Sequence, residues 1–208
     1  MAGSTASRDS YISLVIAVNA FSGGRQHSWT TMDSALSAFE SSLVGDDTAR
    51  MVRPTICNLM GEFAYGATQW ARDIGEGLIN RANSIFQYPI QIELNEPVRY
   101  TPATVPSASE DNAIRVISTQ AREAWKTLGE CLDRAKRDAE RDLETLLTSY
   151  NAHKDYLGEG KFPELLHQQF LDLSTRETDY CSNLEKFSRY MYSIGDYVEK
   201  LLNESAGF

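Results

Sequence analysis

The apolar residues between Phe162 and Leu202 follow alternating steps of four and three, which is the heptad spacing of a long helix with one apolar face. Glu177 interrupts this stripe as a polar residue. A helix with a single apolar face is not stable alone in water, so we expect another helix to lie along it. The apolar members of the stripe are Leu166, Phe170, Leu173, Tyr180, Leu184, Phe187, Met191, Ile194, Val198 and Leu201.

The residues that come before this segment predict its partner. Apolar and small residues recur at three-to-four spacing over about 110–156, and Gly158 and Gly160 indicate a tight turn before the helix over 162–202. Two long helices joined by a short turn pack antiparallel, so residues whose numbers sum to about 319 should face each other. This register places Arg141 opposite Glu177, which predicts an ion pair at the polar position of the stripe.

The N-terminal half shows shorter and less regular patterns. Residues 1–8 are small and polar, and we interpret them as a flexible or partner-ordered arm. Residues 9–44 indicate two short helices, 9–21 and 28–44, separated by Ser22, Gly23 and Gly24. Residues 48–86 predict a glycine-containing helix whose main part, 54–86, begins at Pro54.

Four glycines lie inside the 48–86 pattern, at Gly61, Gly66, Gly75 and Gly77. Each glycine costs about 1 kcal/mol relative to alanine in a helix interior, so their presence needs a reason. We favour close packing against another helix, and the alternative is a hinge near Gly75 and Gly77. Residues 87–109 form an extended, proline-rich connector, which we expect to run along the helices with Arg99 and Tyr100 as contact residues.

These patterns predict an all-α fold in a single helical domain spanning residues 1–208. Its centre is an elongated antiparallel hairpin within 110–202, formed by the helices at about 110–156 and 162–202. We expect the long helix at 54–86 and the two short N-terminal helices to pack against this hairpin.

Apolar residues that the hairpin stripe does not use are the candidate functional residues. The segment 9–21 is apolar nearly all round, so either the rest of the fold or a neighbouring subunit must bury it. Three tyrosines of the last helix lie off the stripe and pack either against the helix at 54–86 or against another subunit. The candidate interface therefore consists of Tyr11, Leu14, Val15, Val18, Tyr190, Tyr192 and Tyr197.

The titratable residues show no catalytic motif that the sequence alone identifies. The hairpin brings His153 near His167, and Glu164 has the Glu-x-x-His spacing of helical carboxylate metal sites. The second copy of the motif that a two-metal site needs does not occur, so we interpret these residues as ordinary polar side chains, with a metal site as the outside alternative. We expect no enzyme activity, no bound cofactor and no metal, since phosphate-loop, nucleophile-elbow and zinc spacings are missing from the sequence. Cys57, Cys131 and Cys181 fit small apolar residues of a reducing compartment.

The net charge of −9 and the isoelectric point of about 4.9 disfavour nonspecific binding to nucleic acid and to anionic membranes. The sequence shows no convincing signal peptide, and the apolar run 11–18 is far shorter than the ~20 residues of a transmembrane helix. We therefore expect a cytoplasmic or intracellular protein.

The expected function is that of a non-enzymatic structural or protein-interaction subunit that self-associates, of the scaffold, coat or filament type, with copies of itself as partners. One alternative is a membrane-associated helical dimer of BAR-like architecture, although an acidic chain lacks the basic face such proteins use. A further alternative is a helical binder of a small apolar ligand or cofactor, held where Trp70, Trp125 and the tyrosines converge.

Overall fold

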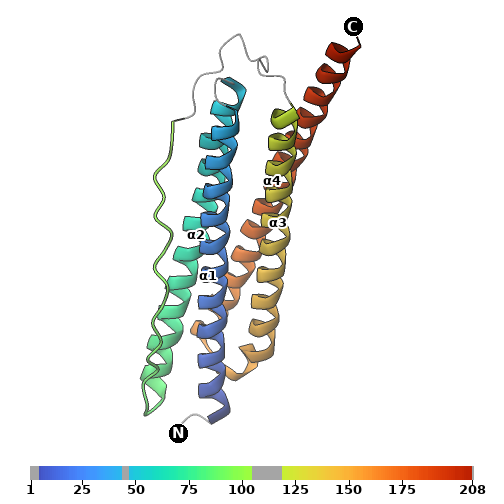
Figure 1. Ribbon diagram of the computed structural model, residues 1–208. Helices are drawn as coiled ribbons and strands as arrows, with labels where there is room; N and C mark the ends of the chain where they lie inside the picture. The colour runs from blue at the N-terminus through green and yellow to red at the C-terminus, as the bar shows by residue number, and fades with distance from the viewer. Residues whose placement is uncertain (1–4, 44–46, 105–118, 208) are drawn as a thin grey trace. The chain divides into compact units, whose positions relative to one another are not determined.

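The structure is a computed structural model that describes residues 5–43, 47–104 and 119–207. It consists of α1 (Thr5–Ser42), α2 (Asp47–Ile85), α3 (Thr119–His153), the 3-10 helix η1 (Lys154–Tyr156) and α4 (Lys161–Ala206) (Figure 1). Within these ranges there is no β-strand. The predicted all-α class, with long helices packed together, is therefore confirmed.

The four helices contribute to two compact units. Unit 1 consists of Met1–His27, Phe63–Arg99 and Asp138–Asp179. Unit 2 consists of Ser28–Glu62, Tyr100–Arg137 and Tyr180–Phe208. Each unit therefore has its own segment of every α-helix and its own core.

Aromatic side chains connect all four helices in unit 1. Phe21 of α1 meets Trp70 of α2 edge to face, and Trp70 meets Phe170 of α4 with ring centroids 5.1 Å apart. Tyr150 of α3 stacks on Phe170 at 4.0 Å. At one end of this core, the hydroxyl of Tyr11 donates a hydrogen bond to the carbonyl oxygen of Leu157 at 3.0 Å. The aromatic contacts of unit 1 therefore form a continuous core, with a hydrogen bond at one end.

The N-terminal region differs from the sequence-based expectation. Residues 5–42 form one helix, so the prediction of two short helices separated at Ser22, Gly23 and Gly24 is wrong. A Cβ atom at Gly24 would lie 2.5 Å from the carboxylate of Asp142, which shows that this glycine permits close packing within a continuous helix. The predicted arm is also helical from Thr5 onward, and its residues 1–4 lie outside the described ranges.

The helix predicted over 48–86 is confirmed as α2, but its beginning differs. It begins at Asp47, seven residues before Pro54, so the prediction that its main part starts at the proline is wrong. Proline lacks an N–H group and therefore removes one hydrogen bond from the first turns of α2. The rest of the helix extends for several turns beyond Pro54, and packing offsets this local cost.

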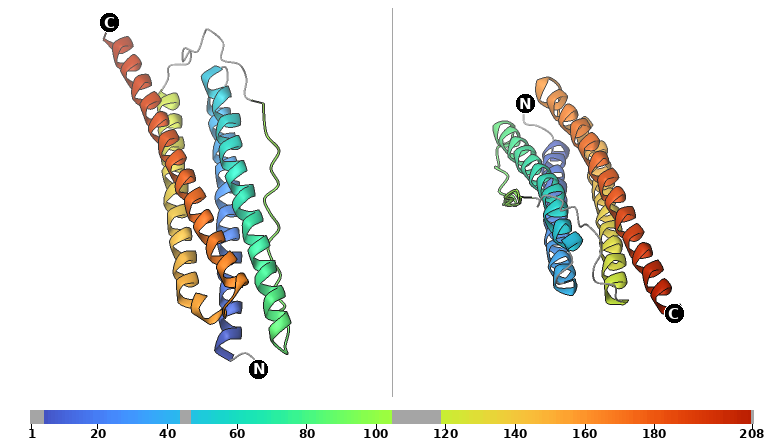
Figure 2. Two further views of the ribbon diagram at one scale, coloured as in Figure 1. Left: turned by 180° about the vertical axis from the view of Figure 1, so that it is seen from behind. Right: turned by 90° about the horizontal axis from the view of Figure 1, so that it is seen from above.

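The extended connector is confirmed for residues 87–104, which we call the strap. It has no regular secondary structure and follows α2 in the two opposite views (Figures 1 and 2). In unit 1, side chains of α1 and α2 satisfy the strap's backbone N–H groups in place of a β-ladder. The acceptors are Asn83 for the N–H of Ile90 at 2.7 Å, Asn19 for Asn95 at 2.8 Å and Thr68 for Val98 at 2.9 Å.

The strap also explains two of the four glycines of α2. A Cβ atom at Gly61 would lie 2.3 Å from the ring of Tyr100, and one at Gly75 would lie 2.8 Å from the side chain of Leu94. Close packing is therefore confirmed at these two positions, but the neighbour is the strap and not another helix. Gly66 and Gly77 have open space beside them.

The α3–α4 hairpin has the predicted turn and register. Gly158 and Gly160 have φ angles of 88° and 107°, which glycine adopts without strain. In unit 1, Tyr150 stacks on Phe170, and in unit 2 Ser188 contacts Gly129; each pair lies within two positions of the predicted register. The beginning of the predicted helix, 110–118, lies outside the described residues.

The ion pair at the polar position of the stripe has a different partner from the one predicted. Glu177 binds Arg25 of α1 with both carboxylate oxygens, including a 3.2 Å contact between Arg25 Nη1 and Glu177 Oε1, and both side chains are buried. Arg141 is two-thirds exposed and instead pairs with Asp138 at 3.1 Å and Asp142 at 3.5 Å. The prediction failed because Glu177 faces α1 across the core of unit 1, whereas Arg141 lies on the solvent side of α3.

Candidate functional site

The C-terminal part of α4, in unit 2, has an inner face that is fixed to α3. Ser188 Oγ donates a hydrogen bond to the carbonyl oxygen of Gly129 at 3.1 Å, and the hydroxyl of Tyr192 donates to Asp133 Oδ2 at 3.1 Å. The ring of Tyr192 passes so close to Gly129 that a Cβ atom there would lie 3.2 Å away. Burial and the Asp133 carboxylate both raise the pKa of Tyr192, so its hydroxyl stays protonated and able to donate.

A group of ion pairs continues this attachment toward the end of α4. Glu199 binds both Arg122 and Lys126 of α3 at 3.2 Å, and Asp196 lies 3.4 Å from Lys126. The carboxylate of Glu123, and after it that of Glu199, raises the pKa of Arg122, while Glu199 and Asp196 raise the pKa of Lys126. Exposed pairs each contribute little stability, but together they fix the rotation of α4 about its axis.

The outer face of the same part of α4 presents a second stripe with alternating steps of four and three. Two tyrosines stand at its centre, Tyr190 with 54% and Tyr197 with 53% of its surface exposed. We call this face the outer stripe; its members, all exposed, are Lys186, Tyr190, Ser193, Tyr197, Lys200 and Glu204. Because the inner face of α4 makes the contacts with α3, the outer stripe is free to contact another molecule.

A hollow between α2 and α4 borders the outer stripe in unit 2. It encloses about 290 Å³, and Tyr190 forms part of both its wall and the outer stripe. The side chains around it are almost all apolar, so water in the hollow finds few hydrogen-bond partners. They are Met51, Val52, Thr55 and Ile56 from α2, and Phe187, Tyr190 and Met191 from α4.

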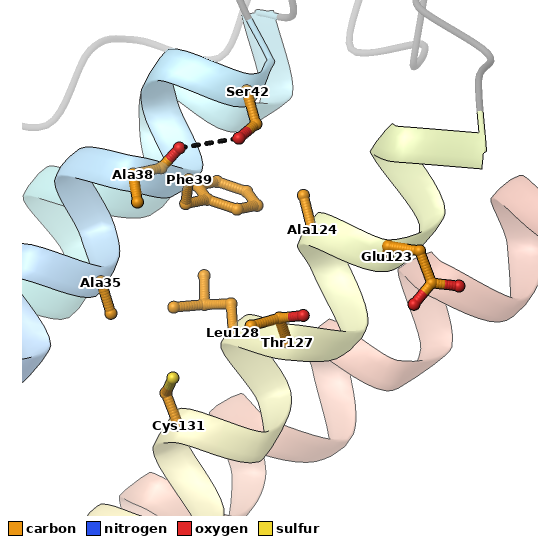
Figure 3. Close-up of a pocket in the computed structure, with 9 residues that line it drawn as sticks. All are labelled: Ala35, Ala38, Phe39, Ser42, Glu123, Ala124, Thr127, Leu128 and Cys131. Carbon is orange, nitrogen blue, oxygen red and sulfur yellow. Dashed lines mark hydrogen bonds between the residues drawn. The ribbon is translucent and has the colours of Figure 1, made fainter.

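A larger hollow of about 510 Å³ lies between α1 and α3 in unit 2 (Figure 3). Phe39 points from α1 toward Ala124 of α3, and the carboxylate of Glu123 points away from Phe39. The thiol of Cys131 stands in the wall, and burial raises the pKa of this thiol, which keeps it in the unreactive protonated form. The other lining residues are Ala35, Ala38, Ser42, Thr127 and Leu128.

The candidate interface residues fall into two groups. Tyr11, Leu14, Val15 and Val18 lie in the core of unit 1, each at most 1% exposed, so the chain itself buries this segment. Of the three tyrosines, Tyr192 packs on α3, while Tyr190 and Tyr197 remain exposed. The sequence predicted these two tyrosines but missed the rest of the outer stripe, although its four-and-three spacing was a readable signal.

His153, Glu164 and His167, the alternative metal site that the sequence suggested, do not form one in the structure. The two histidines have other hydrogen-bond partners. His153 Nδ1 lies 3.1 Å from the hydroxyl of Ser10, and His167 Nδ1 lies 3.1 Å from the hydroxyl of Tyr150. Glu164 is exposed. Among the residues that the structure describes, no group of three or more His, Cys, Asp or Glu side chains is placed to hold a metal ion.

The two tryptophans expected near an apolar pocket belong to different cores. Trp70 packs between Phe21 and Phe170 in unit 1, and Trp125 meets Phe39 edge to face at 4.8 Å in unit 2. The hollows of unit 2 are instead lined by alanine, methionine and phenylalanine. No sequence signal identified them, because small residues in a helix pattern are equally typical of tight packing.

In the ranges covered by the structure, no helix has an apolar stretch of the length needed to cross a membrane. Comparisons with protein-family models, with curated proteins and with solved structures found no match to this chain.

Proposed function

We propose that this protein is a non-enzymatic structural or protein-interaction subunit that self-associates. The observation that carries this proposal is the outer stripe of α4, which presents two half-exposed tyrosines, one of which, Tyr190, also lines an apolar hollow. Tyrosine, methionine and phenylalanine are enriched where protein surfaces meet, and a tyrosine ring buries a large area at a small cost in side-chain entropy.

The distribution of charge supports the same function. The buried carboxylate of Glu177 is paired with Arg25 in the core of unit 1 and does not face a hollow. The hollows themselves are lined by apolar side chains, a thiol and hydroxyl groups, and the carboxylate of Glu123 points out of its hollow. Such walls favour contact with an apolar surface over acid–base chemistry.

Sedimentation velocity of the full chain, over a hundredfold range of concentration, tests this proposal. We expect the weight-average mass to rise with concentration, and electron micrographs at the highest concentration to show assemblies of defined size. A mass equal to that of one 23.3 kDa chain at every concentration would overturn self-association.

The hollow between α1 and α3 favours a second candidate function, the binding of a small apolar ligand. Its volume of about 510 Å³ lies within the range of small-molecule sites, and its walls are mainly apolar. Fluorescence of the dye anilinonaphthalene sulfonate, whose aromatic rings become brighter in apolar surroundings, should rise on addition of the protein, and Ala38→Trp should reduce this signal by filling the hollow. Ala152→Trp, at an exposed position of α3, is the control, and equal signals from both variants would contradict this function.

A further inference from the structure

The order of side chains along the outer stripe is complementary to itself when reversed. It begins with the cation Lys186 and ends with the anion Glu204, and between them lie Tyr190 and Lys200 at equal distances from the centre. We propose that the outer stripe binds the outer stripe of a second copy in antiparallel orientation. This inference rests on the self-association proposed above. Lys186 of each copy then faces Glu204 of the second copy.

This register fixes every other contact of the stripe. If Lys186 faces Glu204, then Tyr190 faces Lys200 of the second copy, and Tyr197 faces Ser193. The ammonium group of Lys200 can lie over the tyrosine ring as a cation–π contact. The large ring of Tyr197 meets the small side chain of Ser193, as close packing requires. Two-fold symmetry produces each of these contacts twice.

The charges also select the orientation. In a parallel arrangement Lys186, Lys200 and Glu204 would each face the same residue of the second copy, and like charges repel. In the antiparallel arrangement opposite charges meet at both ends. Lys200 already has a long 4.0 Å contact with Glu204 of its own helix, where both side chains are largely exposed, so little is lost when they turn toward the second copy.

The contacts of the inner face of α4 with α3 fix the orientation of the outer stripe before it binds a second copy. Ser188 and Tyr192 hold the helix to Gly129 and Asp133, and Glu199 holds it to Arg122 and Lys126. The outer side chains therefore stand on a helix whose rotation is already set, which lowers the ordering cost of association. Because one pair of helix faces is smaller than a standard interface, we expect a weak dimer that salt weakens further.

Charge reversal tests the register. Lys186→Glu and Glu204→Lys should each weaken dimerisation at least tenfold, as measured by sedimentation equilibrium at low salt, because each change places like charges opposite each other. The double variant should recover most of the affinity, since it restores opposite charges with the positions exchanged. Lys161→Glu, at an exposed lysine at the start of α4, makes the same change of net charge as Lys186→Glu and should not affect dimerisation.

The tyrosines test the location. Tyr190→Ala and Tyr197→Ala should each weaken dimerisation at least tenfold, whereas Tyr88→Ala, which removes a 70% exposed tyrosine from the strap, should leave it unchanged. Circular dichroism checks that each variant keeps the helical content of the original chain.

The outcomes separate this inference from the proposed function. If the chain associates but neither the tyrosine changes nor the charge reversals weaken association, the antiparallel α4 interface is wrong while self-association stands. If single charge reversals weaken association and the double variant does not recover it, the proposed register is wrong. If the unmodified chain stays monomeric at every concentration, both the inference and the proposed function are overturned.

Discussion

The two compact units are formed by segments of the same four helices, but they differ in how closely their apolar side chains pack. In unit 1 the aromatic rings from Phe21 to Tyr150 form a continuous core, and the charges of Arg25 and Glu177 neutralise each other inside it. Unit 2 has a core around Trp125, yet it leaves two hollows and the exposed rings of Tyr190 and Tyr197. Both units expose some large apolar side chains, such as Leu165 in unit 1 and Tyr190 in unit 2, so the contrast between them lies in the continuous aromatic core of unit 1 and the hollows of unit 2.

The largest expected effect concerns the buried ion pair of unit 1. Glu177→Ala should lower the free energy of unfolding by about 3–5 kcal/mol, because the buried charge of Arg25 loses its partner. Chemical denaturation measures this loss. The double variant Arg25→Met/Glu177→Leu should recover most of it, and Arg141→Ala, which alters an exposed pair, should change the free energy of unfolding by less than about 0.5 kcal/mol. A small effect of Glu177→Ala would mean that unit 1 is not more tightly organised than unit 2.

Adding the same volume to each unit compares their packing directly. Ala71→Leu should cost about 1–3 kcal/mol of unfolding free energy, because Ala71 is buried in the filled core of unit 1. Ala124→Leu should leave stability unchanged or raise it, because the new side chain enters the hollow between α1 and α3. Thermal and chemical denaturation of both variants give the result, and equal destabilisation by the two changes would remove the contrast between the units.

A pair of glycine substitutions in α2 sharpens the contrast at the strap. Gly61→Ala should lower the free energy of unfolding by about 1 kcal/mol, because the new methyl group displaces the ring of Tyr100 from Gly61 and from its 3.0 Å hydrogen bond to Asn58. Gly66→Ala has open space and should raise stability by about 1 kcal/mol through helix propensity alone. Equal stabilisation by both changes would show that the strap does not pack on α2 in solution.

The smallest expected effect on stability concerns the outer stripe. Tyr190→Ala and Tyr197→Ala together should change the free energy of unfolding by less than about 0.5 kcal/mol at concentrations where the chain is monomeric, because both rings are half exposed. Denaturation of dilute protein measures this. A large loss would mean that these tyrosines serve the fold of unit 2 and not a partner.

Local patterns were sufficient to predict the all-α class and the hairpin, but not every helix boundary or the side-chain partners. The heptad between Phe162 and Leu202, with the turn at Gly158 and Gly160, predicted α4 and its antiparallel register on α3. The same reasoning separated α1 into two helices at Gly23 and Gly24, because a glycine pair that permits close packing cannot be distinguished in sequence from one that ends a helix.

The candidate site shows the same limit. Tyr190 and Tyr197 were identified because they lie off the hairpin stripe, but that criterion did not separate them from Tyr192, which turns inward to Asp133. Tyr11 and Val18 were assigned to an interface for their apolar character alone, and the structure buries them in unit 1. Burial depends on which other helices are near, and helix periodicity does not contain that information.

The sequence by itself determined the helical class, the span of α4 and the glycine turn before it, since these follow from the 3.6-residue period and from the residues that begin or end a helix. Only the tertiary structure decided that Glu177 pairs with Arg25, that the strap packs into the glycines of α2, and that unit 2 keeps open hollows. These features join residues far apart in the chain, and their geometry depends on how several helices approach one another at once.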